Sequence, residues 1–422
     1  MVNKFHYLRG GSETYHFAVG KALEQRGHEV AWFAMEDSKN EPTKWTKYFV
    51  SPADYTSDQG FIQQAKAATT LIYSRESKIK FEKLLKVFRP DVIHLNLVHR
   101  QLTFSILDAP SAQGIPVVYT SHDYIPVCPN CTMLDSHLNI CEACLEKGFL
   151  NCVKKRCVKD SLIKSLLAAA EATYLHQRGV YKKFNKVIAP SNFMKKKLLQ
   201  GDFEDRQVVV MQNFVDNELL DVARSTSYRR EKYFLYFGRL SQEKGVDLVV
   251  SSFLDAFQKI DKDWKLLIAG DGPCKDEISR LIDEANASDR IILLGHLQQD
   301  KMREYIKRAS FTIMGSRWYE NMPFSIVESF AFGKPVIGAN LGGIPEMITS
   351  NKTGFLVDAN STAAMTSAIE RAAVIDQPTY DDMQTRCKEY VLERCSQDQY
   401  VDQLLNLYEG LIESSKEANY EK

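Results

Sequence analysis

Two cationic side chains in the second half of the chain have the spacing of an anion site. Arg239 and Lys244 follow the apolar run Tyr233–Phe237, and Gly238 and Gly245 bracket the segment that holds them. A short loop with two cations at the carboxyl end of a strand suits a diphosphate, because Arg binds phosphate oxygens in pairs and Lys adds a point charge. Two solvated surface cations would show the same spacing, so the pattern alone leaves both interpretations open.

Two glutamates further along the chain could bind a sugar. Glu320 and Glu328 are separated by seven residues, and Pro323 between them suits the first turn of a helix. We therefore expect Glu320 in a loop, where it could accept hydrogen bonds from sugar hydroxyls, and Glu328 inside the helix, where it could bind a ribose diol. The alternatives are a helix-cap or dipole partner for Glu320 and a partly buried acid with a local partner for Glu328.

A cysteine cluster could hold a metal. Six of the nine cysteines lie between Cys128 and Cys157, and they include two C-x-x-C pairs. Thiolates in such pairs suit tetrahedral Zn²⁺, and the symmetric spacing x12, x2, x12 selects four of them as ligands: Cys128, Cys141, Cys144 and Cys157. We predict a structural zinc that ties down an insertion over residues 126–159. An iron–sulfur cluster and free, buried cysteines are the alternatives.

The turn at Gly10 and Gly11 is a weaker candidate for anion binding. It follows the short first apolar segment and opens a helix over Gly11–Gln25. Backbone N–H groups at such a turn can approach an anion, and a helix N-terminus favours negative charge. An ordinary strand-to-helix turn explains the two glycines equally well.

Strands and helices alternate along the whole chain. The apolar runs are continuous, which indicates strands buried on both faces, as in parallel sheets. Six such runs belong to the first half, with a strand over His28–Phe33 among them, and six to the second. Alternation of this kind predicts βαβ units and two doubly wound α/β domains with parallel sheets. We place an N-terminal domain at 1–212, a C-terminal domain at 213–396 and a C-terminal helix at 397–422.

Several of these motifs together resemble a family. The segment from Glu320 to Val336 reads E-x-x-P-F-x-x-x-E-x-x-A-x-G-K-P-V. It follows Gly238-Arg239-Leu240, Lys244-Gly245 and Gly270-Asp271-Gly272-Pro273, and it precedes Gly342-Gly343-Ile344-Pro345-Glu346. In order and spacing the set resembles a family-4 glycosyltransferase of the retaining E-x7-E type. The cysteines resemble those of a subset of that family.

The resemblance implies a fold, a reaction and roles for residues. The fold is GT-B, with two Rossmann-like domains facing a cleft and a C-terminal helix that crosses back to the N-terminal domain. The reaction moves a sugar from a nucleotide sugar, such as a UDP- or GDP-sugar, with retention and without a catalytic metal. Arg239 and Lys244 would bind the diphosphate, Glu328 the ribose and Glu320 the donor sugar.

The resemblance also assigns parts of the site outside these four side chains. His122 would point at the donor sugar, although a hydrogen-bonded strand-end histidine is its plain alternative. Gly10 and Gly11 would border the diphosphate and the acceptor. A run of four residues would contact the sugar and phosphates through its backbone: Asn321, Met322, Pro323 and Phe324. The sequence departs from the family where Asn321 and Phe214 replace common glycines, and its first strand begins late.

Composition limits the remaining classes of function. Lys and Arg number 54 and Asp and Glu 54, so the net charge is zero, which disfavours a nucleic-acid binder. The most apolar stretch, around residues 162–175, is interrupted by charges, and the N-terminus has no apolar signal region, so we expect a cytoplasmic protein. Basic runs such as Lys154–Arg156 and Lys195–Lys197 could touch anionic lipid at the inner face of the membrane.

The acceptor is the least constrained part of the prediction. We expect a glycan or lipid-linked acceptor and a role in polysaccharide or cell-envelope glycan synthesis. Three rivals remain: a sugar-nucleotide epimerase or phosphorylase of the same fold, a Rossmann oxidoreductase, and a zinc-stabilised binding protein without activity. The oxidoreductase requires G-x-G-x-x-G at the first helix, which Gly10-Gly11 does not supply. Retention of both cations and both glutamates argues against the inactive protein.

Overall fold

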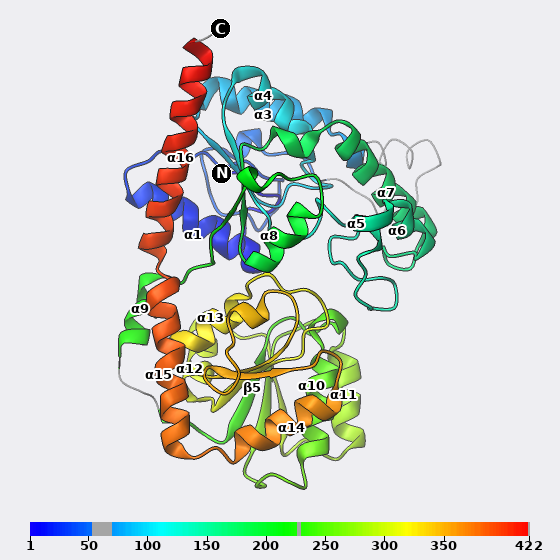
Figure 1. Cartoon of the computed structure of the whole chain (residues 1–422), viewed down its shortest axis with the longest axis vertical. Coiled ribbons are helices and arrows are strands. Elements are labelled where there is room, and N and C mark those ends of the chain that lie inside the picture. Colours follow the sequence, from blue (N-terminus) through cyan, green and yellow to red (C-terminus); the bar gives the residue numbers. More distant parts are fainter. Residues whose placement is uncertain (53–69, 226–228, 421–422) are drawn as a thin grey trace. The chain divides into compact units, whose positions relative to one another are not determined.

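The computed structural model describes residues 1–52, 70–225 and 229–420. These divide into two compact units (Figure 1). The first comprises Met1–Ser136, Cys141–Met211 and Asp398–Lys422, and the second comprises His137–Ile140 and Gln212–Gln397. The last helix, which begins at Gln397, therefore belongs with the N-terminal part of the chain.

The first unit has a parallel sheet of four strands in the order β1-β2-β3-β4. The strands are β1 (Ile93–Leu95), β2 (Val117–Thr120), β3 (Lys186–Ala189) and β4 (Val208–Val210). Its helices are α1 (Gly11–Gln25), α3 (Arg75–Phe88), α4 (Asp108–Gln113), α5 (Ala143–Lys147), α6 (Leu150–Lys154), α7 (Leu162–Gln177), α8 (Asn192–Leu199) and α16 (Gln397–Tyr420).

The structure has no regular strand over residues 28–33 and none before the turn at Gly10, so both of these predictions are wrong. In their place, isolated parallel bridges join Val2 to Phe33 and to Leu95, and Met35 to Val50. The chain still runs alongside β1 there, because the amide of Val2 donates to the carbonyl of His94 at 2.8 Å. The pairing is too short and irregular to count as strands. The predicted helix over Gly11–Gln25 is confirmed with the same bounds.

The second unit has a parallel sheet of six strands in the order β10-β9-β8-β5-β6-β7. The strands are β5 (Tyr233–Phe237), β6 (Lys265–Ala269), β7 (Ile291–Gly295), β8 (Phe311–Met314), β9 (Val336–Ala339) and β10 (Gly354–Val357). Its helices are α9 (Asn217–Arg224), α10 (Val246–Ala256), α11 (Lys275–Glu284), α12 (Gln299–Arg308), α13 (Phe324–Ala331), α14 (Thr362–Ala373) and α15 (Gln377–Arg394). Short 3₁₀ helices complete the two units at Thr46–Tyr48, Phe104–Leu107, Val180–Lys183, Asp205–Gln207, Gln242–Lys244 and Ile344–Glu346.

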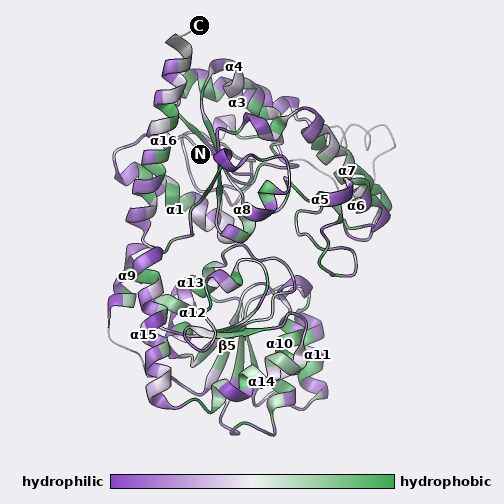
Figure 2. Ribbon diagram, viewed as in Figure 1, coloured by the Kyte–Doolittle hydropathy of each residue, from purple (hydrophilic) through white to green (hydrophobic). Residues whose placement is uncertain are grey.

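The central strands of the second sheet are buried on both faces, as their continuous apolar runs predict. Phe234 and Ile268 pack into one apolar cluster with residues of α10, α11 and α14. Leu235 and Leu267, whose side chains alternate with these, pack into a second cluster with residues of α9, α13 and α15. In Figure 2 the strands at the centre of this sheet are coloured mainly green, for hydrophobic residues. The doubly wound α/β fold is therefore confirmed.

Polar side-chain contacts fix the final helix, α16, to the first unit. The hydroxyl of Tyr400 lies 2.5 Å from that of Tyr15 on α1, and Arg26 pairs with Asp402 at 2.8 Å. Tyr408 bonds the ring of His94 on β1. These contacts join residues early in the chain to residues near its end. The first unit is therefore complete only when the chain has passed through the second unit and returned as α16.

Several buried histidines should make the first unit sensitive to acid. Burial lowers the pKa of His6 to about 4 and that of His94 to about 3, and it holds the pKa of His16 and His99 well below the usual value. A histidine that stays neutral in the folded protein is protonated after unfolding once the pH falls below about 6.5. Stability is therefore complete above that pH and is lost as the pH falls towards the folded pKa values.

We predict that the His6→Phe variant loses less stability in acid than the natural protein. His6 packs against Phe17, Trp32 and Phe49, and its buried Nδ1 has no hydrogen-bond partner among the described residues, so an apolar ring fits there. At pH 5 the difference should be on the order of 2 kcal/mol, measured by urea unfolding at pH 7.5 and pH 5. Substitution of the exposed His296 by Gln is the control, and an equal acid sensitivity of both variants would contradict the assignment.

Candidate active site

The two loops that hold the predicted site follow neighbouring strands. β5 and β8 pair directly, with Phe234 opposite Phe311 and Leu235 opposite Thr312. Because both strands are parallel, their carboxyl ends lie at the same edge of the sheet, and the chain leaves that edge at Gly238 and at Gly315. The strand order thus brings together residues that are about eighty positions apart in the sequence.

Lys244 and Glu320 form an ion pair across these loops. The Nζ atom of Lys244 lies 2.7 Å from Oε1 of Glu320. The same oxygen accepts hydrogen bonds from Ser316 Oγ at 2.8 Å and from Trp318 Nε1 at 2.7 Å, and the Lys244 ammonium lies 4.9 Å from the centre of the Trp318 ring. None of these contacts uses Oε2. The carboxylate is therefore held in one orientation, with its second oxygen left to accept a bond from a ligand.

Glycines let the loops meet backbone to backbone. Gly245 has φ +63°, and a Cβ there would lie 1.9 Å from the carbonyl oxygen of Gly315. Gly342 has φ +64°, and its Cβ would lie 2.4 Å from the carbonyl oxygen of Glu320, which also accepts the amide of Gly343 at 2.7 Å. A larger residue at either glycine would push the Glu320 loop away from its partners.

Glu328 lies on the second turn of α13, as predicted, whereas Pro323 lies one residue before the helix. Pro323 is the N-cap residue, and the helix starts at Phe324. Burial raises the pKa of Glu328 to about 7, and Arg303 opposes that rise. Arg303 already pairs with Asp216 at 3.1 Å and with Glu218 at 2.7 Å. Glu328 is therefore a half-buried carboxyl group, suited to hydrogen bonds with neutral hydroxyls.

Asn213 also supports the site. The sequence singles it out only as the residue before Phe214, which replaces a glycine common in the family it resembles. Its Nδ2 donates to the carbonyl oxygen of Met322 at 2.7 Å, and its amide lies 2.9 Å from the Met322 sulfur. Both residues are buried. Asn213 thus fixes the backbone that enters α13, and no local pattern in the sequence identifies that contact.

Arg239 differs from Lys244 in being uncommitted. Its side chain is exposed and has no ion-pair partner in the part of the chain that the structure describes. Its backbone is fixed, because the hydroxyl of Tyr236 donates to its carbonyl oxygen at 2.8 Å. A guanidinium on a fixed backbone, beside a lysine that is already paired, is the more available of the two cations for an anion.

In the first unit, His122 lies at the carboxyl edge of the sheet, and the two glycines lie at the start of α1. His122 follows β2, and its Nε2 lies 2.8 Å from Oδ1 of Asn96, which follows β1. Burial lowers the pKa of His122 to about 3, so the imidazole is neutral at physiological pH. Gly10 is the N-cap of α1 and Gly11 its first residue; both are exposed.

The structure groups a further set of potential ligands that the sequence did not predict. The ligand atoms of His99, Asp123 and Cys131 lie within 4.8 Å of one another. The Nζ atom of Lys4 lies 3.5 Å from Nε2 of His99. Arg100 lies beside this set and pairs with Glu171 at 3.4 Å. Two adjacent cations disfavour a divalent metal, so we interpret the set as a buried charge network. Its members come from three separate segments, which explains why no motif marks it.

The predicted zinc ligands are not all brought together. No three of the sulfurs of Cys128, Cys141, Cys144 and Cys157 lie within 4.8 Å of one another in the described structure. Cys128 and Cys157 are buried, and burial raises the pKa of the Cys128 thiol to about 12, with Cys144 and Cys157 nearby adding to the rise. Cys141 instead accepts a contact from Lys155 at 3.3 Å, while Cys152 lies beside Cys157.

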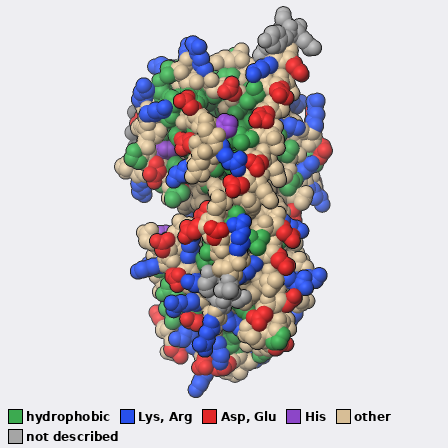
Figure 3. Space-filling view, turned by 90° about the vertical axis from the view of Figure 1, so that its left-hand side faces the viewer, with side chains coloured by type: hydrophobic (Ala, Val, Ile, Leu, Met, Phe, Trp, Pro, Cys, Tyr) green, Lys and Arg blue, Asp and Glu red, His purple; other side chains and the backbone are tan. Residues whose placement is uncertain are grey.

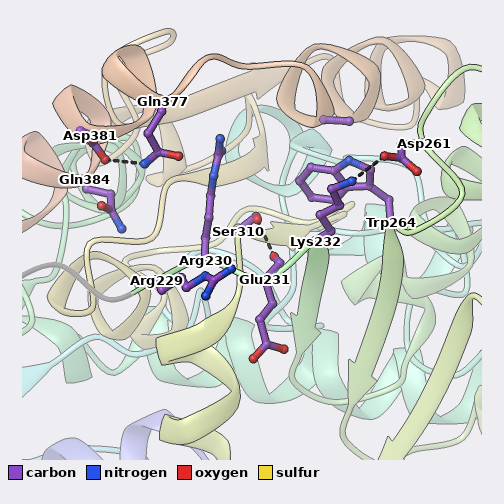
Figure 4. Close-up of a pocket in the computed structure, with 11 residues that line it drawn as sticks. Arg229, Arg230, Glu231, Lys232, Asp261, Trp264, Ser310, Gln377, Asp381 and Gln384 are labelled. Carbon is purple, nitrogen blue, oxygen red and sulfur yellow. Dashed lines mark hydrogen bonds and ion pairs between the residues drawn. The ribbon is translucent and has the colours of Figure 1, made fainter.

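A large cavity in the second unit lies at the opposite edge of the sheet (Figure 4). Its volume is about 570 Å³, and its lining includes Arg230, Lys232 and Ser310, which precede β5 and β8. Lys232 is paired with Asp261 there, as Figure 4 shows. Ligands of parallel sheets bind at the carboxyl ends of the strands, so this cavity is separate from the predicted donor site.

We predict that Gly342→Ala weakens the site through Glu320. The new methyl group would collide with the Glu320 backbone, and a non-glycine residue at φ +64° adds strain of about 1 kcal/mol. The variant should melt earlier, and the fluorescence of Trp318 should change because its contacts with Glu320 and Lys244 are disturbed. The control is Gly410→Ala, because that helical glycine has open space and alanine there should stabilise the helix. An unchanged melting temperature for Gly342→Ala would contradict the proposed packing.

Comparison with known proteins agrees with this geometry. The model of Glycosyltransferase Family 4 matches residues 9–219, and that of Glycosyl transferases group 1 matches residues 220–394. N-acetyl-alpha-D-glucosaminyl L-malate synthase of Bacillus anthracis is 26% identical over 221 residues, which are 50% of this chain and 56% of that protein. The lipopolysaccharide core biosynthesis mannosyltransferase LpsB of Rhizobium meliloti is 28% identical over 145 residues, 33% of this chain and 40% of that protein.

A solved structure covers nearly the whole chain. The crystal structure of Anabaena HepE in complex with UDP has a TM-score of 0.65 at 15% identity and covers 97% of this chain and 98% of its own. The two relatives are matched over little more than half of their length or less, so they do not define the activity of the whole chain. The two family models run in sequence along almost all of it, and the first alone covers half. The protein therefore belongs to glycosyltransferase family 4, and its two parallel-sheet units have the GT-B fold.

Proposed function

We propose that this protein transfers a sugar from a nucleoside-diphosphate sugar to a glycan or lipid-linked acceptor, with retention of the anomeric configuration. The observation that carries the proposal is the Lys244–Glu320 pair at the carboxyl edge of the second sheet, with Arg239 on the same loop as Lys244. That edge combines cations for a diphosphate with an oriented carboxylate for sugar hydroxyls. We infer a role in polysaccharide or cell-envelope glycan synthesis, in keeping with the description of its LpsB relative.

The donor would be held mainly by side chains of the second unit. Arg239 binds the diphosphate in a bidentate manner, and Lys244 adds positive charge beside it. Glu328 binds the ribose diol, and Oε2 of Glu320 accepts a bond from a hydroxyl of the sugar. The N-terminus of α13 and the backbone from Asn321 to Phe324 contact the sugar and phosphates. Uridine is our first choice of base because HepE binds UDP, and guanosine is the second.

Catalysis in this arrangement depends on stabilising the leaving group. The bond between the sugar C1 and the diphosphate oxygen breaks, and the acceptor oxygen bonds C1 on the same face. The acceptor proton passes to the departing phosphate oxygen, whose charge Arg239 and Lys244 stabilise. Glu320 is fixed by Lys244, so it orients the sugar and does not act as a nucleophile. His122, neutral and held by Asn96, hydrogen-bonds the sugar from the first unit, where Gly10 and Gly11 border the acceptor.

Titration calorimetry with UDP, GDP and ADP is the direct test of the donor site. We expect one nucleotide to bind, and Arg239→Ala and Glu328→Gln each to weaken it by about tenfold or more, the usual effect of removing a charged hydrogen-bond partner. Binding should strengthen from pH 6 to pH 8, because Glu328, with a pKa of about 7, accepts from the ribose better when ionised. Lys301→Ala, on exposed α12, is the matched control. Absence of binding by every nucleotide would refute the proposal.

The stereochemical part of the proposal needs a separate measurement. Once a donor sugar is turned over, nuclear magnetic resonance of the product reports the anomeric configuration. A product with the donor's configuration supports retention, and an inverted product would overturn the mechanism while leaving the donor site intact.

We further propose a structural zinc in the cysteine-rich segment. α5 buries none of its residues and α6 buries only Cys152, so the helical part of the segment has little apolar core of its own. Small segments of this kind need a metal or disulfide for stability, and thiolates suit zinc. The symmetric spacing favours Cys128, Cys141, Cys144 and Cys157 as ligands. Because Cys152 lies beside Cys157, it competes with Cys141 for the fourth place.

Zinc content decides both the metal and its ligands. We expect about one zinc per chain, released on unfolding and detected by a chromogenic chelator. Cys128→Ser and Cys144→Ser should lose it, Cys131→Ser should keep it, and a comparison of Cys141→Ser with Cys152→Ser identifies the fourth ligand. Protein that refolds with zinc available yet retains none would refute the proposal.

A further inference from the structure

Exposed apolar side chains gather on one part of the first unit. Leu150 is 68% exposed, Leu162 53%, Ile163 71% and Leu166 53%. In the described chain eight large apolar residues are at least 50% exposed, and four of them fall within these seventeen positions. Leu150 begins α6 and the other three lie in the first turns of α7, the two helices being in contact. Figure 1 shows α6 and α7 side by side.

The start of α7 is apolar on two sides, and only one of them is covered. Ser165, Ala168, Ala169 and Ala172 are buried against the unit. Leu162 and Leu166 are one turn apart, so they share a face, and Ile163 stands next to them. The helix start is well defined, because Ser161 caps it by accepting the amide of Lys164. The exposed leucines are thus presented on a fixed helix, where folding alone would favour polar residues.

Cations surround this apolar group. Between residues 146 and 166 the chain has six Lys and Arg against two acids, Glu146 and Asp160, although its total net charge is zero. The six are exposed: Lys147, Lys154, Lys155, Arg156, Lys159 and Lys164. On the face drawn in Figure 3, by contrast, side chains of both signs are interspersed. This segment therefore has a local excess of positive charge.

An anionic lipid surface fits both properties. The interface of a bilayer accepts Leu and Ile side chains at the acyl boundary, while its phosphate groups attract Lys and Arg. A second copy of the chain fits less well, because a two-fold contact would set two patches of the same positive charge against each other. In the described residues no helix has the length and apolarity to cross a bilayer, so contact would be made at the surface.

We propose that the α6–α7 surface, formed by Leu150, Leu162, Ile163 and Leu166 with the cations around them, binds anionic membrane. The inference rests on the proposed function for its biological sense, since it brings the first unit to the surface that carries a lipid-linked acceptor. The contact itself needs neither donor nor acceptor. It can therefore be measured independently of transfer.

Sedimentation with vesicles tests the proposal on the full chain. The protein should pellet with vesicles of phosphatidylcholine and phosphatidylglycerol in equal parts, but not with phosphatidylcholine alone, and salt should release it. Ile163→Ser combined with Leu166→Ser should lower the partition coefficient by about tenfold or more, because two apolar side chains no longer enter the interface. Lys159→Glu combined with Lys164→Glu should remove the preference for phosphatidylglycerol. Val374→Ser, at an equally exposed position in the second unit, should change nothing.

Three results would overturn the proposal. These are no binding to either vesicle, binding that the Ile163 and Leu166 substitutions leave unchanged, and a dimer in light scattering that the same substitutions dissociate. Circular dichroism and nucleotide calorimetry on each variant show whether the fold and the donor site persist. A variant that binds nucleotide but not vesicles supports the membrane surface, whereas a natural protein that binds vesicles but no nucleotide refutes only the donor site.

Discussion

The ion pair between Lys244 and Glu320 is the contact on which the candidate active site depends. It joins the loop after β5 to the loop after β8 at a distance of 2.7 Å, and it fixes one oxygen of the carboxylate. Glu320 is buried. Without the pair, its ionised form would be an unfavourable buried charge, and its protonated form would be free to rotate. With the pair in place, the lysine is oriented along with the glutamate. One interaction therefore sets both a positive group for phosphate and an acceptor for a sugar hydroxyl.

That pair is possible only because of constraints on the backbone around it. β5 and β8 must be neighbours, and the loops that follow them must approach more closely than side chains permit. Gly245 meets the backbone at Gly315, and Gly342 meets the backbone at Glu320. Asn213 then holds Met322, so the chain enters α13 from a fixed point and Glu328 is carried on the second turn. The site is thus assembled by main-chain packing, with the charged groups added to it.

The sequence was sufficient for the periodic features and for those carried by a local motif. Continuous apolar runs predicted the parallel sheets, and E-x7-E placed Glu320 in a loop and Glu328 in a helix. The sequence did not reveal the Lys244–Glu320 contact or the role of Asn213, because both depend on how distant segments meet in the fold and not on a local motif. The strand expected at 28–33 was wrong because its pairing with Val2 consists of isolated bridges. The network of His99, Asp123 and Cys131 escaped notice for a similar reason, since three segments contribute to it.

The cysteine-rich segment and the start of α7 depend on each other physically. Cys157 lies five residues before Leu162, and little apolar surface holds the chain between them: Val158 is half-buried, while Lys159 and Asp160 are exposed and have positive φ. Leu162 and Ile163 are exposed, so their burial does not hold α7 in place. Other residues must fix the position of this helix. Ser165, Ala168 and Ala169 anchor one side, and Cys157, buried beside Cys152, holds the turn before the helix. The proposed zinc would add a second anchor to a helix start that Ser161 already caps, and this places the zinc segment next to the proposed membrane contact.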